Sequence, residues 1–301
     1  MALKQIKNKI ISTQKTGKVT KAMESVSAVK MRKSQERAFA GRPYVHAALR
    51  ILSRLANSQD GLSHPLAEKR SAGKKLIVIV TSDKGLAGSV NSAVLKRVDD
   101  MAKNGNEFDV IAVGRKAIEY AKREGHTLLG EYMNIADDVT MEDVYDMTAK
   151  VMEAFSGDSS YSEVEVVYQN FLSTFEQEPT KRQVLPLDPA ELHYIMRGIK
   201  PKEGKWSGDV EGPESTIGYT VEPSAEEVLN TLIPQLVQIV LYHALLESKA
   251  SEHSARMVAM KNATDKSKEV AKALTLKYNK ARQAVITAEV SEITGGIEAM
   301  K

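Results

Sequence analysis

The chain has 301 residues, of which 42% are hydrophobic and 27% charged, a composition typical of folded domains and not of disordered chains. It contains no cysteine, which excludes disulfides, cysteine-ligated zinc and thiol catalysis. The net charge of +3 is unevenly distributed: residues 1–50 carry +10, residues 51–246 carry −10 and residues 247–301 carry +3. A basic N-terminal arm requires an acidic partner, which is nucleic acid, an anionic membrane or acidic protein loops.

We expect no secretory signal peptide at the N-terminus, because lysines interrupt the apolar pattern of residues 1–14. The most apolar windows, residues 75–82 and 231–246, are too short or too polar to span a bilayer. No transit peptide is visible, which indicates a prokaryotic or already processed chain. We therefore expect a soluble chain, or a peripheral one that partners hold at a membrane.

Residues 1–58 are predicted to form a long helix. Small and apolar residues recur there at helical spacing while Lys and Arg fill the other faces, and Pro43 marks a kink or a junction. The repeating positions are Leu3, Ile6, Ile10, Val19, Ala22, Val26, Val29, Val45, Ala48, Leu52 and Leu55.

Residues 74–222 are predicted to form a Rossmann-like α/β domain. Strands over 74–82 and 108–114 alternate with helices over 92–105 and 115–125, which indicates parallel pairing with right-handed crossovers. The remaining predicted elements are a helix over 141–156, two strands of a hairpin over 162–174 and 181–187, and a Gly- and Pro-rich loop over 196–218.

Residues 223–301 are predicted to form a second long helix. Ser224 and Glu227 form a capping box at its start, and Gly295-Gly296 is expected to stop it near Thr294. Its roughly 70 residues would span about 105 Å, with Pro234 bending it. A globular domain cannot bury a helix of that length, so the helix must project.

Two long helices at opposite ends of a chain can coil around each other in an antiparallel coiled coil. A 3.5-residue rhythm marks the C-terminal seam. Small side chains at a seam permit close approach but bury little surface, so a surrounding partner is expected to support the coil. The seam positions are Leu229, Leu232, Leu236, Ile239, His243, Leu246, Ala250, His253, Met257, Met260, Thr264, Ser267, Ala271, Leu274, Tyr278, Ala281 and Val285.

Residues 12–44 and 244–293, together with TSDKGLAGSVN at 81–91, resemble the gamma subunit of F-type ATP synthases. The resemblance implies a rotor shaft without a catalytic site or cofactor of its own, present in one copy per complex. The coiled coil would lie inside a ring of alpha and beta subunits, and the α/β domain beside epsilon on the membrane c ring. Proton flow would turn the c ring and the shaft, at the cytoplasmic face of a prokaryotic cell membrane, without insertion of this chain into the membrane.

The resemblance also implies residues that contact partners. Arg282 and Gln283 match a pair that hydrogen-bonds a loop of beta, with Thr287 nearby. Met23 matches a residue close to an acidic loop of beta, and Tyr219 matches a position that contacts the c ring or epsilon. If the resemblance is set aside, Arg282 and Gln283 are explained as part of a solvated helix face, and Met23 as a methionine that fills a gap in the packing. The cations expected to share the acidic contact are Lys18, Lys21, Lys30 and Arg32.

Two other classes of function remain open from the residues alone. The basic arm would suit a coiled-coil protein that binds nucleic acid, although aromatic residues are not interleaved with it. Residues 85–91 (GLAGSVN) would suit a nucleotide-binding α/β domain with a dimerising coiled coil, but they lack both phosphate-loop spacings and fit a tight turn better. The histidines show no metal spacing, and turn chemistry explains Asp83 and Asp137-Asp138.

Overall fold

The computed structural model describes residues 3–56, 64–103, 105, 107–157, 161–188, 222 and 224–300. The chain divides into two compact units. The two-helix unit comprises residues 1–27 and 256–301, and the α/β unit comprises residues 28–255. The long helices at the two chain ends contribute to both units, and each unit is described by itself.

Two helices lie near the N-terminus, α1 (Leu3–Ala40) and α2 (Arg42–Ala56), and one long helix, α7 (Ala225–Ala299), lies near the C-terminus. The predicted N-terminal helix is interrupted at Gly41, and Pro43 lies in the first turn of α2, where its missing N–H costs no helical hydrogen bond. The junction expected at Pro43 is thus present.

Helix α7 has 75 residues and begins as predicted, with the backbone N–H of Glu227 donating to Ser224 Oγ at 3.2 Å. Its predicted end was wrong, because the helix continues through Gly295-Gly296 to Ala299. A glycine ends a helix by adopting a left-handed conformation, and these two glycines stay helical in open space.

The centre of the α/β unit is a five-stranded sheet in the order β3-β2-β1-β4-β5. Strand β1 pairs in parallel with β2 and β4, β2 pairs in parallel with β3, and β4 and β5 form the predicted antiparallel hairpin. The α/β fold class with long terminal helices is confirmed. The strands are β1 (Lys74–Val80), β2 (Phe108–Val113), β3 (Leu128–Tyr132), β4 (Tyr161–Phe171) and β5 (Gln177–Leu185).

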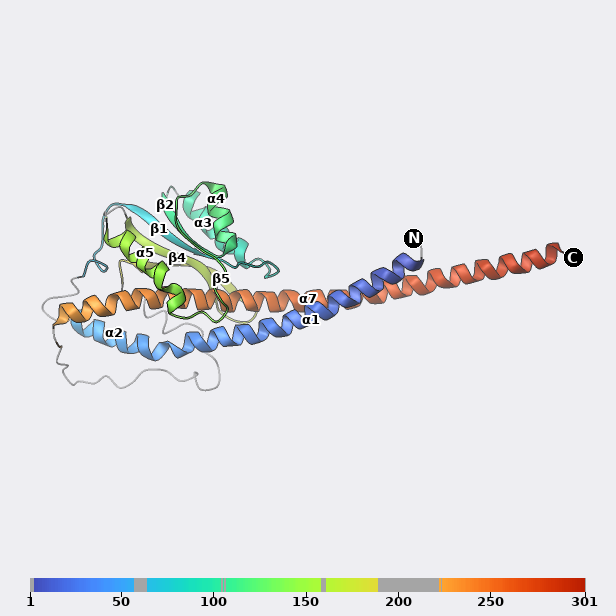
Figure 1. Ribbon diagram of the computed structural model, residues 1–301, viewed down its shortest axis with the longest axis horizontal. Helices are drawn as coiled ribbons and strands as arrows, with labels where there is room; N and C mark the ends of the chain where they lie inside the picture. The colour runs from blue at the N-terminus through green and yellow to red at the C-terminus, as the bar shows by residue number, and fades with distance from the viewer. Residues whose placement is uncertain are drawn as a thin grey trace. The chain divides into compact units, whose positions relative to one another are not determined.

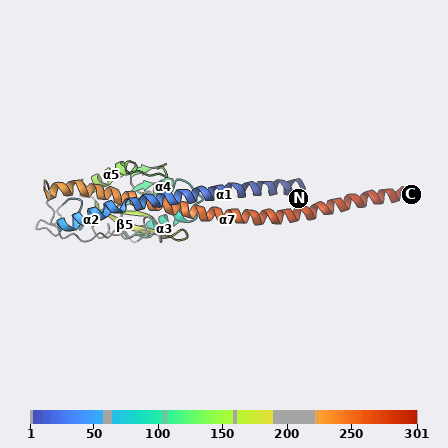
Figure 2. The same cartoon turned by 90° about the horizontal axis from the view of Figure 1, so that it is seen from below.

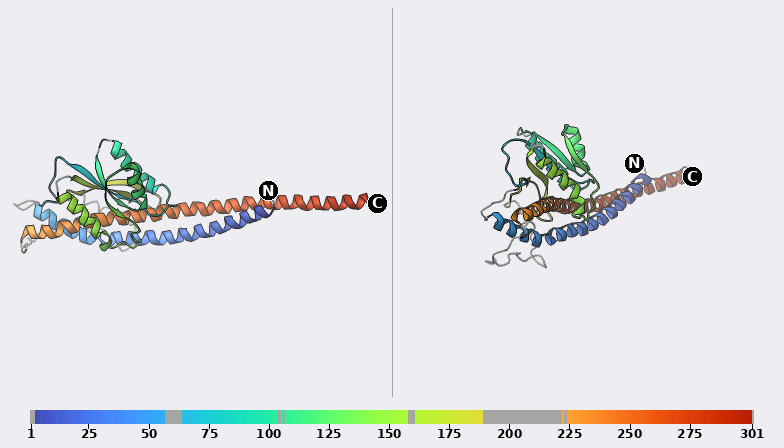
Figure 3. Two further views of the ribbon diagram at one scale, coloured as in Figure 1. Left: turned by 45° about the horizontal axis from the view of Figure 1, so that its top comes forward. Right: turned by 60° about the vertical axis from the view of Figure 1, so that its left-hand side comes forward.

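Helices cover both faces of this sheet (Figures 1 and 3). Helices α3 (Val90–Lys103) and α4 (Arg115–Glu124) pack on one face around Ile77 and Ile79. The other face packs around Leu76 and Val78 against α2, α5 (Tyr145–Ser156) and the first part of α7, with the short helix η1 (Glu142–Val144) preceding α5. Burial from both sides explains why β1 reads as an uninterrupted apolar run.

Within the described residues, one helix, α7, is long and apolar enough to cross a membrane by length and composition. This differs from the expectation that its apolar window is too polar. However, 56% of the window that meets the criterion is buried inside the protein. Burial of Ile233, Leu236 and Leu241 in the core of the α/β unit explains why this stretch is apolar.

In the two-helix unit, the first residues of α1 lie antiparallel beside α7 (Figure 2). Thr20 Oγ1 and Thr264 Oγ1 are 2.7 Å apart, and one turn away Gly17 lies against Ser267. The predicted seam of α7 is confirmed in this unit, since its positions from Thr264 to Ala281 are buried or half-buried. Beyond them, α7 extends past the start of α1, and Val285 is 42% exposed.

The predicted inner face of α1 was only partly right. Ile6 is buried and Ile10 half-buried, but Val19 and Val26 are 58% and 54% exposed, and Ala22 and Val29 are exposed as well. The positions that face inward instead are small or polar: Thr13, Gly17, Thr20, Ser27 and Ser34.

Candidate functional site: partner-binding surfaces of the two long helices

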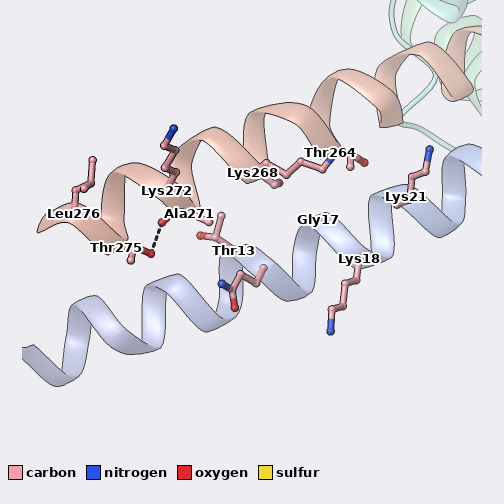
Figure 4. Close-up of a pocket in the computed structure, with 12 residues that line it drawn as sticks. Thr13, Gly17, Lys18, Lys21, Thr264, Lys268, Ala271, Lys272, Thr275 and Leu276 are labelled. Carbon is pink, nitrogen blue, oxygen red and sulfur yellow. Dashed lines mark hydrogen bonds between the residues drawn. The ribbon is translucent and has the colours of Figure 1, made fainter. Parts of the chain in front are cut away.

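A groove of about 820 Å³ lies between α1 and α7 in the two-helix unit (Figure 4). Small side chains form the floor of this groove and let the two helix backbones approach each other closely. A Cβ added at Gly17 would lie 3.3 Å from the Cβ of Ser267, a spacing that admits no larger residue without movement. The residues of the floor are Thr13, Gly17, Thr264, Ser267 and Ala271.

Lysines surround this groove and come from both helices. Figure 4 shows Lys18 pointing away from α7 and Lys272 pointing away from α1. Lys21 pairs with Glu24 on its own helix at 2.9 Å, and Lys268 pairs with Asp265 at 3.3 Å.

These ion pairs are exposed, so they contribute little stability and leave the lysines accessible to solvent. No ion pair joins Lys18 or Lys272 to another residue in the part of the chain that the structure describes. The arrangement places cations at the edges of a groove whose floor is made of small side chains. It can attract an acidic segment through a contact that tolerates sliding.

The last turns of α7 carry the other predicted contact residues. Arg282, Gln283 and Thr287 are exposed, and the hydroxyl of Thr287 donates to the backbone oxygen of Gln283 at 2.9 Å. Their side chains therefore face solvent in the isolated chain. The same stretch exposes large apolar side chains: Val285, Ile286, Val290, Ile293 and Ile297.

The remaining predicted residues differ in their surroundings. Met23 is half-buried and Arg32 is exposed. Lys30, expected to share the contact with an acidic partner loop, instead donates to Asp137 Oδ2 within this chain at 2.5 Å. Tyr219 lies outside the described residues.

Asp137 is a functional candidate that the sequence prediction missed, since turn chemistry was expected to explain it. Its other oxygen, Oδ1, lies 2.9 Å from His253 Nε2 and 3.8 Å from Lys249 Nζ. His253, which was expected at the seam or its flank, is buried and is a partner of this carboxylate. No local pattern in the sequence identifies this site, because Lys249 and His253 lie more than 100 residues from Asp137 along the chain.

The carboxyl ends of the parallel strands test the nucleotide-binding alternative, because ligands of doubly wound sheets bind there. Asp83 follows β1, and its Oδ1 accepts the backbone N–H of Arg115, the first residue of α4, at 3.0 Å. Its Oδ2 accepts the backbone N–H of Asn134 at 3.0 Å. The protein thus places its own carboxylate where the N-terminus of a helix would otherwise attract a phosphate.

Helix α7 further closes these strand ends. Leu245, Ser248 and Lys249 of α7 meet Thr81 and Gly114 around a cavity of about 10 Å³. Pockets for small molecules measure roughly 300–1,000 Å³. This cavity cannot hold a nucleotide, and Asp83 serves as an internal anion that joins the β1–α3 loop to α4.

Comparison with known protein families gives a match over nearly the whole chain. A family model described as ATP synthase matches residues 2–300. A chain of the central stalk and c-ring structure of Tetrahymena thermophila mitochondrial ATP synthase is similar, with 27% identity, coverage of 81% of this chain and 99% of that chain, and a TM-score of 0.58.

Two chains from Euglena gracilis mitochondrial ATP synthase share the fold. One, from the rotor in rotational state 1, has 17% identity, covers 94% of this chain and 98% of its own, and has a TM-score of 0.62. The other, from the OSCP/F1/c-ring structure in rotational state 3, has 19% identity, coverage of 99% and 94%, and a TM-score of 0.63. Since the family match extends over nearly the whole chain, the protein described above belongs to the gamma-subunit family of ATP synthases.

Proposed function

We propose that this chain is the non-catalytic central rotor shaft of a proton-translocating F-type ATP synthase. It couples rotation of the membrane c ring to the conformational cycle of catalytic beta subunits. The observation that carries the proposal is the family match over residues 2–300, together with two long helices that flank one α/β domain. The similar Tetrahymena structure is a central stalk with a c ring, which supports the same assignment.

The geometry of the two-helix unit supports a rotating contact. Cations such as Lys18 and Lys272 lie beside a groove whose floor is made of small side chains and whose lining contains no aromatic residue. Long-range attraction to acidic loops of beta persists when the register changes, whereas large aromatic anchors would lock one position. Lys21 and Arg32 share this attraction, and Met23 lies close to the same loop.

The partners follow from this proposal. Alpha and beta subunits surround the coiled coil, and epsilon and the c ring contact the α/β domain, with Tyr219 as a contact residue there. One copy of this chain enters each complex, nucleic acid is not a partner, and the chain does not itself insert into the membrane. We place the complex at the cytoplasmic face of a prokaryotic cell membrane.

Reconstitution tests the proposal. The chain is mixed with cognate alpha and beta subunits, and ATP hydrolysis is measured with and without azide. We expect one copy per alpha–beta ring and azide-sensitive, multi-site hydrolysis that depends on the chain. A ring that assembles and turns over identically without it, or a chain that prefers DNA to the ring, contradicts the proposal.

A second experiment tests the contact residues on α7. We expect Arg282→Ala and Gln283→Ala to lower hydrolysis by the reconstituted complex, because Arg282 supplies a bidentate donor for a carboxylate or carbonyl of the beta loop. Lys280→Ala is the matched control, since Lys280 is exposed on the same turn. Equal effects of Arg282→Ala and Lys280→Ala would assign the loss to charge alone.

A further inference from the structure

The loop after β3, residues 133–141, brings one carboxylate to both long helices of the α/β unit. Asp137 Oδ2 accepts a hydrogen bond from Lys30 of α1 at 2.5 Å. Oδ1 lies 2.9 Å from His253 Nε2 and 3.8 Å from Lys249 Nζ, both on α7. Each oxygen is therefore committed to a different helix. An ionised carboxylate only accepts hydrogen bonds, so Nε2 of His253 carries a proton and donates to Oδ1.

Side chains from both helices hold the backbone of the same loop. Arg37 of α1 donates to the oxygen of Val139 at 3.4 Å, and the hydroxyl of Tyr242 of α7 donates to the same oxygen at 3.3 Å. Lys249 donates to the oxygen of Ile135 at 2.9 Å. The Val139 side chain is 1% exposed and belongs to the apolar core. The loop is thus anchored by core packing and by α1 and α7 together.

The position of this contact along the helices is informative. The two compact units divide between residues 27 and 28 on α1 and between residues 255 and 256 on α7. Lys30 and His253 lie within three residues of these divisions. Asp137 therefore binds both helices at the last turn that belongs to the α/β unit. A twisting load between that unit and the rest of the helices must pass through this turn.

We propose that Asp137 is a positioning residue that fixes α1 and α7 to the α/β domain as one body and so prevents slippage during rotation. This inference rests on the proposed rotor function. Without the clasp formed by Asp137, Lys30 and His253, only core packing and the hydrogen bonds of Arg37, Tyr242 and Lys249 to the loop backbone remain, and each helix is held less firmly against a small turn about its own axis. Rotation delivered to the α/β domain would then be partly lost before it reached the coiled coil.

The electrostatics suit a permanent contact. Burial alone would raise the pKa of Asp137, but the hydrogen bond from Lys30 and the charges of His253, Lys249 and Lys30 lower it to about 2. The carboxylate therefore stays ionised at every pH at which a cell works. The neighbouring Asp138 is exposed, and no ion pair joins it to another described residue, so it supplies a matched control with the same charge in the same loop.

The experiment compares Asp137→Asn with Asp138→Asn in the full chain. In the first arm, hydrogen exchange of residues 133–141 is measured on the purified chain. In the second, each variant is assembled into the complete ATP synthase in vesicles, and ATP-driven proton pumping is divided by ATP hydrolysis. Lys30→Ala against Lys33→Ala repeats the comparison from α1, where Lys33 is exposed, in case Asp137→Asn fails to fold.

We expect exchange in the loop to be at least about threefold faster in Asp137→Asn, as for the loss of a partly exposed ion pair. We also expect the ratio of pumping to hydrolysis to fall by about half in this variant, with hydrolysis retained, and Asp138→Asn to match the parent chain. Unchanged exchange, faster exchange with an unchanged ratio, or equal effects of the two substitutions overturns the inference. A parent complex that never couples pumping to hydrolysis overturns the proposed function instead, because the exchange arm does not depend on rotation.

Discussion

Thr20 and Thr264, 244 residues apart in the chain, share a buried hydrogen bond of 2.7 Å between their side-chain oxygens. Each hydroxyl also has an acceptor on its own helix: Gly17 O lies 3.2 Å from Thr20 Oγ1, and Met260 O lies 2.8 Å from Thr264 Oγ1. A hydroxyl has a single proton, so one of the two threonines donates across the seam and the other to its own backbone.

Thr20→Val is expected to destabilise the two-helix unit by about 1 kcal/mol, because it removes one partner of a buried polar pair. The double variant Thr20→Val, Thr264→Val is expected to cost less than the sum of the single changes, because no hydroxyl is then left without its cross-seam partner. Urea unfolding of the four chains measures the cycle. Thr16→Val, at an exposed hydroxyl of α1, is the control, and strict additivity would contradict the pairing.

Gly17→Val is expected to destabilise the two-helix unit by about 1–3 kcal/mol, although valine has the higher intrinsic helix propensity. Even a Cβ at this position would lie 3.3 Å from the Cβ of Ser267, so the branches of valine force the helices apart. Circular dichroism during thermal unfolding measures the change.

Gly295→Ala provides the opposite comparison, because nothing lies within 4 Å of a Cβ placed there. This helical position should gain up to about 1 kcal/mol of local helix stability. If Gly17→Val proves as stabilising as Gly295→Ala, the close approach at the seam does not limit the size of residue 17.

Asp83→Ala is expected to destabilise the α/β unit by about 1–3 kcal/mol, since it leaves the N–H groups of Arg115 and Asn134 without their acceptor. Formate or acetate added to the variant should restore part of the loss, because a free carboxylate can enter the vacated position. The same salts should leave Asp100→Ala unaffected, since Asp100 is exposed on α3. Thermal unfolding with sodium chloride at matched ionic strength decides between rescue and a general salt effect.

The acid sensitivity of Asp137 gives a pH-dependent prediction. Its pKa is lowered from 3.8 to about 2 in the folded chain, so the contact stabilises the fold above about pH 4 and is lost as the pH falls through 2. The free energy of unfolding of the parent chain should therefore exceed that of Asp137→Asn from neutral pH down to about pH 4. The difference should shrink as the pH falls through 2, and the two should converge below it. A difference that does not shrink as the pH falls from 4 through 2 would show that the carboxylate does not carry the effect.

The sequence predicted the elements of this fold where apolar patterns were long, and missed them where the side chains were small or the elements short. β1 was evident because burial on both faces gives a continuous apolar run, whereas β3 (Leu128–Tyr132) is short and only partly apolar. At the seam of α1, hydrophobicity favoured Val19 and Val26, but the close approach of the helices selects Gly17 and Thr20.

Only those parts of the candidate site that depend on a single helix could be predicted from the sequence. The basic character of α1 and the exposed positions on α7 are properties of one helix at a time. The clasp at Asp137 depends on a loop that meets residues more than 100 positions away in both directions along the chain, at Lys30 and His253. No local spacing encodes such a meeting, and an acidic residue in a turn has the same local pattern with or without it.

The antiparallel pairing of the chain ends also determines when the protein can finish folding. Thr20 leaves the ribosome 244 residues before Thr264. At about 5–20 residues per second, α1 waits roughly 12–50 s for its partner helix. During this interval its twelve Lys and Arg residues within positions 1–50 keep the early chain strongly cationic, and like-charge repulsion opposes the association of nascent copies. The positive charge for which we propose an acidic partner thus also opposes self-association of the chain during its synthesis.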